Sequence, residues 1–263
     1  MKRLLAFSSM TLAFCALARA QEATGDRVVV PARNSARPHQ VNASVLNGSI
    51  TVKTYAGKEV IVETSGGPRQ ERAPAGMRRI DSPRGLEVTE EDNVVTVKLN
   101  PPAHGNLVIT VPPDTSLKLK SNQGSVAADG VRGEVEAKSL NGAITLTHIS
   151  GTVVADTLNG ELKVSMDRVD PGKPMSFSTL NGPIDVTLPA DTKGNLKMKT
   201  DHGAIYSDFE IKLTAGGATT EPNTTKDGKF RVRFDRTMYG TINGGGPELT
   251  FNTLNGTINI RKR

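Results

Sequence analysis

The sequence has very little aromatic surface. Tryptophan is absent, and the aromatic residues together make up 4% of the 263 residues. A core of large rings is therefore excluded, and the interior is expected to consist of Val, Ile, Leu and Ala side chains. No dense basic stripe with interleaved aromatic residues occurs either, so a nucleic-acid partner is not expected.

Cysteine is almost absent as well. Cys15 is the only one, and it lies in the apolar stretch near the start of the chain. Disulfides and thiolate metal sites are thus excluded beyond this stretch. Lipid attachment at Cys15 would need a small residue just before it, and the bulky Phe14 argues against a lipoprotein. Stability must come from backbone ladders and stacked side chains.

Long hydrophobic runs are limited to residues 4–17. This run follows Met1-Lys2-Arg3 and precedes Ala18-Arg19-Ala20, the layout of a secretory signal peptide that is too short to anchor the chain in a membrane. We expect residues 1–20 to be removed near Ala20 and the protein to be exported to the periplasm or the cell surface. Three of the 33 basic residues leave with this segment, so 30 remain against 27 acidic ones, a mild net charge of +3.

One unit recurs through the rest of the chain. It consists of Leu-Asn-Gly followed by alternating apolar and polar residues, as in Leu140-Asn141-Gly142-Ala143-Ile144-Thr145-Leu146. Degenerate copies stand at Asn122-Gln123-Gly124 and Asp201-His202-Gly203. Asn and Gly tolerate positive φ, so each pair is predicted to form a tight structural turn. The five intact turn pairs are Asn47 and Gly48, Asn141 and Gly142, Asn159 and Gly160, Asn181 and Gly182, and Asn255 and Gly256.

The spacing of the copies predicts the architecture. Further glycines stand midway between copies, so that Gly133, Gly142, Gly151 and Gly160 are nine residues apart. Each unit of about 18–22 residues is thus two short strands and two turns. The matched halves favour an all-β solenoid in which each turn of the chain stacks on the one before. A β-sandwich or a meander of hairpins remains the alternative. In a solenoid the repeated asparagines could bond to one another, or form a polar ridge that binds glycan.

The regions between and around the repeats have a different composition. We expect an irregular leader over residues 21–40, a single β-repeat domain over 41–263, and loop excursions at 65–85 and 215–228, which are rich in Gly and Pro. A hairpin is predicted around Glu91-Asp92-Asn93. Tight turns are predicted where Pro-x-Asp-Thr follows a strand, at residues 112–115 and 189–192.

These features resemble the bacterial DUF4097 family, an adhesin-like β-strand-repeat domain. The resemblance is carried by the Leu-Asn-Gly-x-Ile-x-Val copies, the two Pro-x-Asp-Thr turns and the segment from Gly240-Thr241-Ile242 to Ile260, and it covers roughly residues 40–263. It implies a right-handed stack of β-coils, export or surface exposure, and a role in adhesion. It supplies no catalytic residues.

Catalytic and metal-binding patterns are weak. Asp156, Glu161 and Asp185 are the acids nearest the repeats, and each is expected to be a solvated outward side chain. The four histidines, His39, His104, His148 and His202, show no metal-ligand spacing. Gly244-Gly245-Gly246 lacks a following helix and is interpreted as a turn or bulge.

The sequence thus predicts an exported binding or scaffolding protein without an enzymatic activity, a cofactor or a metal. Its expected partner is an envelope glycan or an envelope protein. A polysaccharide lyase or hydrolase is the alternative, which would require several carboxylates converging in one groove. The basic end, Arg261-Lys262-Arg263, is expected to protect an exposed sheet edge from aggregation, or else to attract an anionic polymer.

Overall fold

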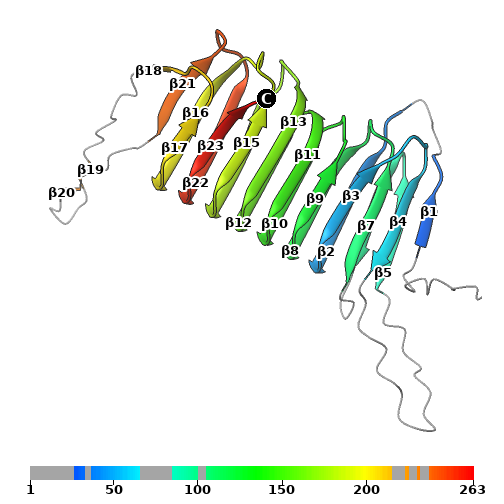
Figure 1. The fold of residues 1–263 in the computed structure, drawn as a ribbon. Coiled ribbons are helices and arrows are strands. Elements are labelled where there is room, and N and C mark those ends of the chain that lie inside the picture. Colours follow the sequence, from blue (N-terminus) through cyan, green and yellow to red (C-terminus); the bar gives the residue numbers. More distant parts are fainter. Residues whose placement is uncertain are drawn as a thin grey trace, which may run out of the picture.

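The computed structural model describes residues 27–32, 37–65, 85–99, 105–214, 223–224, 230–231 and 237–263. The predicted signal peptide, Cys15, His104 and most of the two predicted loop excursions lie outside these residues. No helix occurs within the described part, so none there could span a membrane. The described chain is all-β, as predicted, and consists of two large sheets and one small one (Figure 1).

The two large sheets face each other as layers. In spatial order, the eleven-stranded sheet contains β18 (Lys212–Thr214), β21 (Met238–Ile242), β16 (Gly194–His202), β22 (Glu248–Asn255), β14 (Met175–Asn181), β12 (Val153–Asn159), β10 (Val135–Asn141), β8 (Ser116–Gln123), β2 (Gln40–Asn47), β6 (Val94–Leu99) and β5 (Leu86–Glu91). The ten-stranded sheet contains β1 (Arg27–Val30), β4 (Val60–Ser65), β7 (Asn106–Val111), β3 (Ile50–Thr54), β9 (Val126–Asp129), β11 (Ile144–Gly151), β13 (Leu162–Val169), β15 (Ile184–Leu188), β23 (Ile258–Lys262) and β17 (Ile205–Ser207). The third sheet pairs β19 (Asn223–Thr224) with β20 (Phe230–Arg231).

The chain alternates between the two large sheets. We call a strand of the eleven-stranded sheet, together with the strand of the other sheet that follows it, a rung; β10/β11 is an example. Neighbouring rungs pair in parallel in both sheets, with Val135 opposite Val153 and Ile144 opposite Leu162. Antiparallel hairpins do not join the repeats, so the meander alternative is wrong. In every rung except β6/β7, a two-residue turn redirects the chain to the opposite layer instead.

The order of the rungs differs from the prediction at both ends. Between β8/β9 and β14/β15, each rung stacks on the one before, as expected. The first rung, β2/β3, lies between β6/β7 and β8/β9, and the rung β22/β23 lies between β14/β15 and β16/β17. Because all rungs share one register and one inward pattern, a rung fits wherever its neighbours leave room. The expectation of strictly successive stacking is therefore wrong at these two positions.

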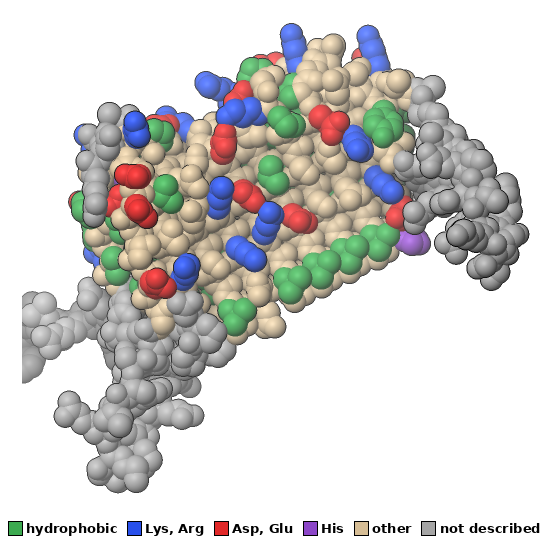
Figure 2. All heavy atoms as spheres, turned by 180° about the vertical axis from the view of Figure 1, so that it is seen from behind, with side chains coloured by type: hydrophobic (Ala, Val, Ile, Leu, Met, Phe, Trp, Pro, Cys, Tyr) green, Lys and Arg blue, Asp and Glu red, His purple; other side chains and the backbone are tan. Residues whose placement is uncertain are grey.

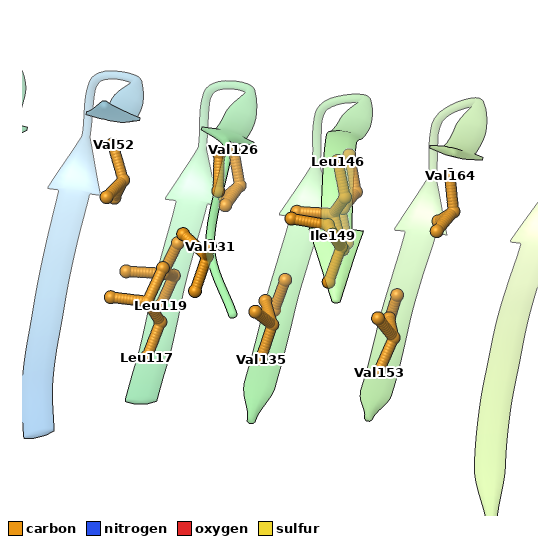
Figure 3. Packing of buried hydrophobic residues seen from close by; sticks show 14 of the residues in the cluster. Val52, Leu117, Leu119, Val126, Val131, Val135, Leu146, Ile149, Val153 and Val164 are labelled. Atoms are coloured by element: carbon orange, nitrogen blue, oxygen red, sulfur yellow. The ribbon is translucent and has the colours of Figure 1, made fainter. Parts of the chain in front are cut away.

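The core lies between the two layers. In Figure 3, Leu117 and Leu119 of β8 and Val135 of β10 point into the same interior as Leu146 and Ile149 of β11. Aliphatic residues dominate, which follows from alternation in strands with one buried face. The predicted interior of Val, Ile, Leu and Ala is not aliphatic throughout, because Phe177 and Phe251 are fully buried and stack with ring centroids 5.1 Å apart.

The predicted turns are present in the described residues. β5 and β6 form the expected antiparallel hairpin, with Asp92 and Asn93 at φ values of 51° and 63° between them. In the two Pro-x-Asp-Thr turns, the amides of Thr115 and Thr192 donate to the carbonyls of Pro112 and Pro189.

The irregular leader predicted over residues 21–40 is wrong for Arg27–Val30. These residues form β1, which pairs antiparallel with β4. The run of three valines at 28–30 supplies the strand propensity that the surrounding Pro and Arg residues obscured.

Candidate functional site

The asparagines of the repeated turns form a hydrogen-bonded ladder. Asn159 donates its side-chain amide to Oδ1 of Asn141 at 2.8 Å, Asn181 donates to Asn159 at 2.8 Å, and Asn255 donates to Asn181 at 2.7 Å. Asn47 has Gln123 as its neighbour in the adjacent strand, so the run of asparagines is interrupted there. The amides thus bond along the stack rather than only within their own turns.

The reason for glycine in these turns is mainly steric. A Cβ atom on Gly142, Gly160 or Gly256 would lie 2.2, 2.3 or 1.9 Å from the carbonyl oxygen of the turn glycine in the next rung. Gly48 and Gly182 have φ values of 147° and 157°, whereas none of the motif asparagines adopts positive φ. The predicted left-handed conformation of the asparagines is therefore wrong, and positive φ occurs only at the glycine, in two of the five turns.

Buried hydroxyl groups join the same turns on the inner side. The Ser139 hydroxyl donates to the Gly124 carbonyl at 3.1 Å, and Thr157 donates to Gly142 at 2.9 Å. The corresponding donors in other rungs are Ser121, Thr179, Thr253 and Thr200, and each bonds to the turn glycine of the adjacent rung. These bonds fix the edge of the stack along which the outward side chains are displayed.

A row of leucines lies on the outside of this edge. Leu140, Leu158 and Leu180 immediately precede the ladder asparagines and are 46%, 39% and 38% exposed. Leu254 of β22 continues the row and is half-buried. Figure 2 shows the resulting line of hydrophobic side chains along one edge of a face on which the other hydrophobic side chains are scattered among charged ones. We call these four residues the leucine ridge; with strands about 4.8 Å apart, it is about 14 Å long.

The ridge is bounded differently at its two ends. Toward β8 the leucine position is taken by Asn122, beyond which Leu46 is again exposed at 40%. Toward β16 it is taken by Asp201, next to His202, which pairs with Asn255 in the strand register. The degenerate copies of the motif thus flank the ridge with polar groups.

A shallow groove runs beside the ridge on the outer face of the eleven-stranded sheet. It is lined by the ridge leucines and by Lys138, Asp156, Ser178, Lys199 and Asn252, among others. Lys138 bonds to Glu136 at 2.6 Å. This hydrogen bond lowers the pKa of Glu136 and raises the pKa of Lys138, so both side chains are charged at neutral pH. The groove is therefore polar along one side and apolar along the other.

Comparison with known proteins identifies the family. The family model described as Toastrack DUF4097 matches residues 10–261. The chain belongs to the Toastrack DUF4097 family. No curated protein matches the sequence.

Two solved structures resemble this Toastrack chain. A proposed cell adhesion protein from Clostridium sporogenes is 13% identical, with 91% of this chain and 99% of that chain covered and a TM-score of 0.47. A proposed adhesin from Bacteroides fragilis is 9% identical, with 91% and 97% covered and a TM-score of 0.30.

The acids considered in the sequence are not brought together in this Toastrack fold. Asp156 lines the groove on β12, whereas Asp185 lies on β15 of the opposite sheet and pairs with Arg261 at 3.0 Å. Glu161 is exposed beside its turn. Within the described residues, no group of three or more His, Cys, Asp and Glu side chains could hold a metal ion.

The described histidines occupy separate positions. His39 is buried, with its Nε2 3.1 Å from the Lys58 carbonyl. His148 contacts Asp129 at 2.8 Å, and hydrogen bonds from His148 and Thr147 lower the pKa of Asp129. His202 stands in the asparagine position of its rung, as the motif indicates.

The leucine ridge was not predicted, although the sequence contains its signal. In Ala137-Lys138-Ser139-Leu140, the inward positions are Ala137 and Ser139. Strand alternation then places Leu140 on the outward face, and the same holds for every intact copy. An apolar residue repeated at an outward position is the pattern that distinguishes a displayed row from a core row.

Proposed function

We propose that this protein is an exported, non-catalytic binding protein of the cell envelope and that its contact surface is the leucine ridge with the adjoining groove. The observation that carries the proposal is the contiguous row of exposed leucines at 140, 158 and 180. A polar residue at these outward positions would be equally compatible with the strand. Scattered exposed leucines are ordinary, but a contiguous aligned row is typical of an interaction site.

The chemistry of the surface favours a protein partner over a glycan. The groove is lined by aliphatic, hydroxyl, amide and charged side chains, and its described lining contains no aromatic ring on which a sugar could stack. Leucine methyl groups gain most from burial against other apolar side chains. Lys138, Asp156 and Lys199 beside the ridge provide charges of both signs for orienting such a partner.

The scaffold supports display rather than catalysis. We infer that the rungs wind as a right-handed solenoid, as the family resemblance implies, since the chain alternates between layers and neighbouring rungs pair in parallel. Each rung repeats the same outward positions, which offers several equivalent contacts in a line. The proposal that the protein is exported is based on the predicted signal peptide at residues 1–20. Mass spectrometry of the mature protein is expected to find Gln21 as its first residue.

The proposal is tested by binding to isolated envelope material. The mature protein is expected to be retained by untreated envelope and to lose retention when envelope proteins are digested with protease. The double variant Leu158→Asn/Leu180→Asn is expected to lose retention as well, because it removes the centre of the ridge. Its control is Val29→Asn, which makes a comparable change at a side chain that is 45% exposed on β1.

Three results would contradict this function. Retention that survives protease but is lost after enzymatic digestion of the envelope glycan would identify a glycan ligand. Equal loss of binding in the ridge variant and the Val29→Asn variant would remove the ridge from the interaction. Release of reducing ends from envelope polysaccharide by the pure protein would contradict the absence of catalysis. Circular dichroism of each variant separates loss of binding from loss of fold.

A further inference from the structure

The rung β22/β23 is inserted between two rungs that precede it in the chain. β22 pairs in parallel with β14 on one side and with β16 on the other. β23 does the same with β15 and β17. Rung β22/β23 therefore fills a slot whose walls are β14/β15 and β16/β17.

Side-chain contacts bind the inserted rung to its first wall. Phe251 stacks on Phe177, with an angle of 24° between the rings. The Thr253 hydroxyl donates to the Gly182 carbonyl at 3.2 Å, and the Asn255 amide donates to Asn181. On the second wall, Thr200 donates to the Gly256 carbonyl at 2.9 Å. All these partners lie within the slot and the inserted rung.

A single short crossover joins the inserted rung to the rest of the described chain. β21 pairs with the outer side of β16, and β22 pairs with its inner side, so residues 243–247 pass over the beginning of β16. Asn243 donates to the carbonyls of Ala190 and Thr192 at 3.0 and 2.7 Å, and Asn195 donates to Gly246 at 2.6 Å. These bonds hold the crossover against the start of β16.

The backbone of the crossover adopts a conformation that few residue types tolerate. Asn243, Gly244 and Gly245 have φ values of 48°, 89° and 86°, three consecutive residues in the left-handed region. Glycine reaches this region without strain, whereas a β-branched residue does so only at a cost. The turn predicted at Gly244-Gly245-Gly246 is thus the hinge that lets the chain double back over β16.

We propose that rung β22/β23 is exchanged between copies of this protein, so that the slot of one copy accepts residues 248–263 of a second copy. The partner of this surface is the chain itself. The ring stack, the hydroxyl bonds and the amide ladder are the same whichever chain supplies the rung, so exchange changes only the crossover. The intramolecular arrangement is favoured by its high effective concentration, and the exchanged dimer is favoured when folding occurs at high protein concentration.

Paired cysteines in separate full-length copies test this proposal. In a Cys15→Ser background, one copy carries Ser178→Cys on β14 and the other carries Asn252→Cys on β22; these two residues are opposite each other in the strand register. The copies are unfolded, mixed, refolded and oxidised. Exchange is expected to give a disulfide-linked dimer. While the dimer is the minor species, its ratio to monomer rises about tenfold for a tenfold rise in protein concentration.

A hinge variant sharpens the test. Gly244→Val/Gly245→Val places β-branched residues where the left-handed backbone is required, so the crossover is expected to open and the dimer fraction to increase. A chain with both Ser178→Cys and Asn252→Cys serves as the positive control, since it should form the bond within a monomer. Lys199→Cys replaces Asn252→Cys in the negative control, because β22 separates β16 from β14.

The outcomes are distinct. A dimer from the Ser178/Asn252 mixture, with none from the Ser178/Lys199 mixture, supports exchange. The proposal is overturned if the doubly substituted chain forms its internal bond and the mixture gives no dimer. It is also overturned if the Ser178/Lys199 mixture gives as much dimer, since β14 and β16 would then meet directly or the cysteines would react by random collision.

Discussion

Each turn glycine faces the backbone of the neighbouring rung. A Cβ on Gly160 would lie 2.3 Å from the Gly142 oxygen and 2.6 Å from its carbonyl carbon. Neither atom belongs to a flexible side chain, so relief of the overlap requires two rungs to separate. Glycine is therefore required at position 160 by the contact between neighbouring rungs. The turn itself does not require it, because φ at Gly160 lies outside the left-handed range.

Gly160→Ala is expected to lower the free energy of unfolding by about 3 kcal/mol, because overpacking against backbone displaces a whole rung. Gly172→Ala is the matched control, since the nearest atom to its Cβ would be 3.6 Å away. Urea unfolding followed by circular dichroism measures both. Equal urea midpoints for the two variants would show that the neighbouring rungs can separate at Gly160 with little loss of stability.

A second residue-scale test concerns the buried hydroxyls. Ser139→Ala removes the bond to Gly124 and leaves that carbonyl without this donor, so a loss of about 1–2 kcal/mol in unfolding free energy is expected. Ser139→Thr is expected to be nearly neutral, because Thr157 and Thr179 occupy the equivalent positions. Calorimetry or urea unfolding compares the two. A neutral Ser139→Ala would mean that water satisfies the carbonyl.

At the scale of elements, the alternation of Val, Ile and Thr was enough to predict the strands, and Asn-Gly was enough to predict the turns. The order of the rungs could not be predicted in the same way, because inward and outward residues alternate alike in every rung. The pairing of Phe177 with Phe251 is the side-chain signal that places β22 next to β14. The sequence alone does not reveal this pairing, because it can be recognised only when β14 and β22 are known to be adjacent.

The strand order predicts which residues are coupled energetically. A double-mutant cycle of Phe177→Leu and Phe251→Leu is expected to give a coupling of about 0.5–1.5 kcal/mol, the value typical of stacked rings. The cycle of Phe177→Leu with Met198→Leu is the control, because Phe251 lies opposite both Phe177 and Met198 and separates them. Coupling between residues 177 and 198 should be weaker than between 177 and 251, because the first two act on each other only through Phe251. A stronger coupling between residues 177 and 198 would contradict the insertion.

At the scale of the whole molecule, stability is built from contacts between neighbouring rungs. Rungs from β8/β9 to β14/β15 have a rung on each side. The strands at the ends of the two sheets, β1, β5, β17 and β18, have one neighbouring strand each. The candidate contact surface lies over the doubly supported rungs, which gives the leucine ridge a rigid base.

Amide hydrogen exchange is expected to follow this arrangement. Amides of β10, β12 and β14 should exchange most slowly, and those of β1, β5, β17 and β18 should exchange fastest, because local opening at an end breaks contacts with one neighbour only. Mass spectrometry of proteolytic fragments measures the gradient. Uniform protection throughout the described strands would indicate a single cooperative unit instead.

The insertion of β22 between β14 and β16 also has a consequence for the nascent chain. The ribosome makes β14 and β16 in close succession, and β22 begins only at Glu248. Until Asn255 has been synthesised, β16 cannot complete its native pairing with β22. Until then a growing chain can pair β16 with β21 on its outer side, but it must leave the inner side of β16 unpaired, or pair that side with β14 and later reopen the pair. The order of the strands thus requires residues up to Asn255 to be present before this end of the protein can complete its fold, wherever folding takes place.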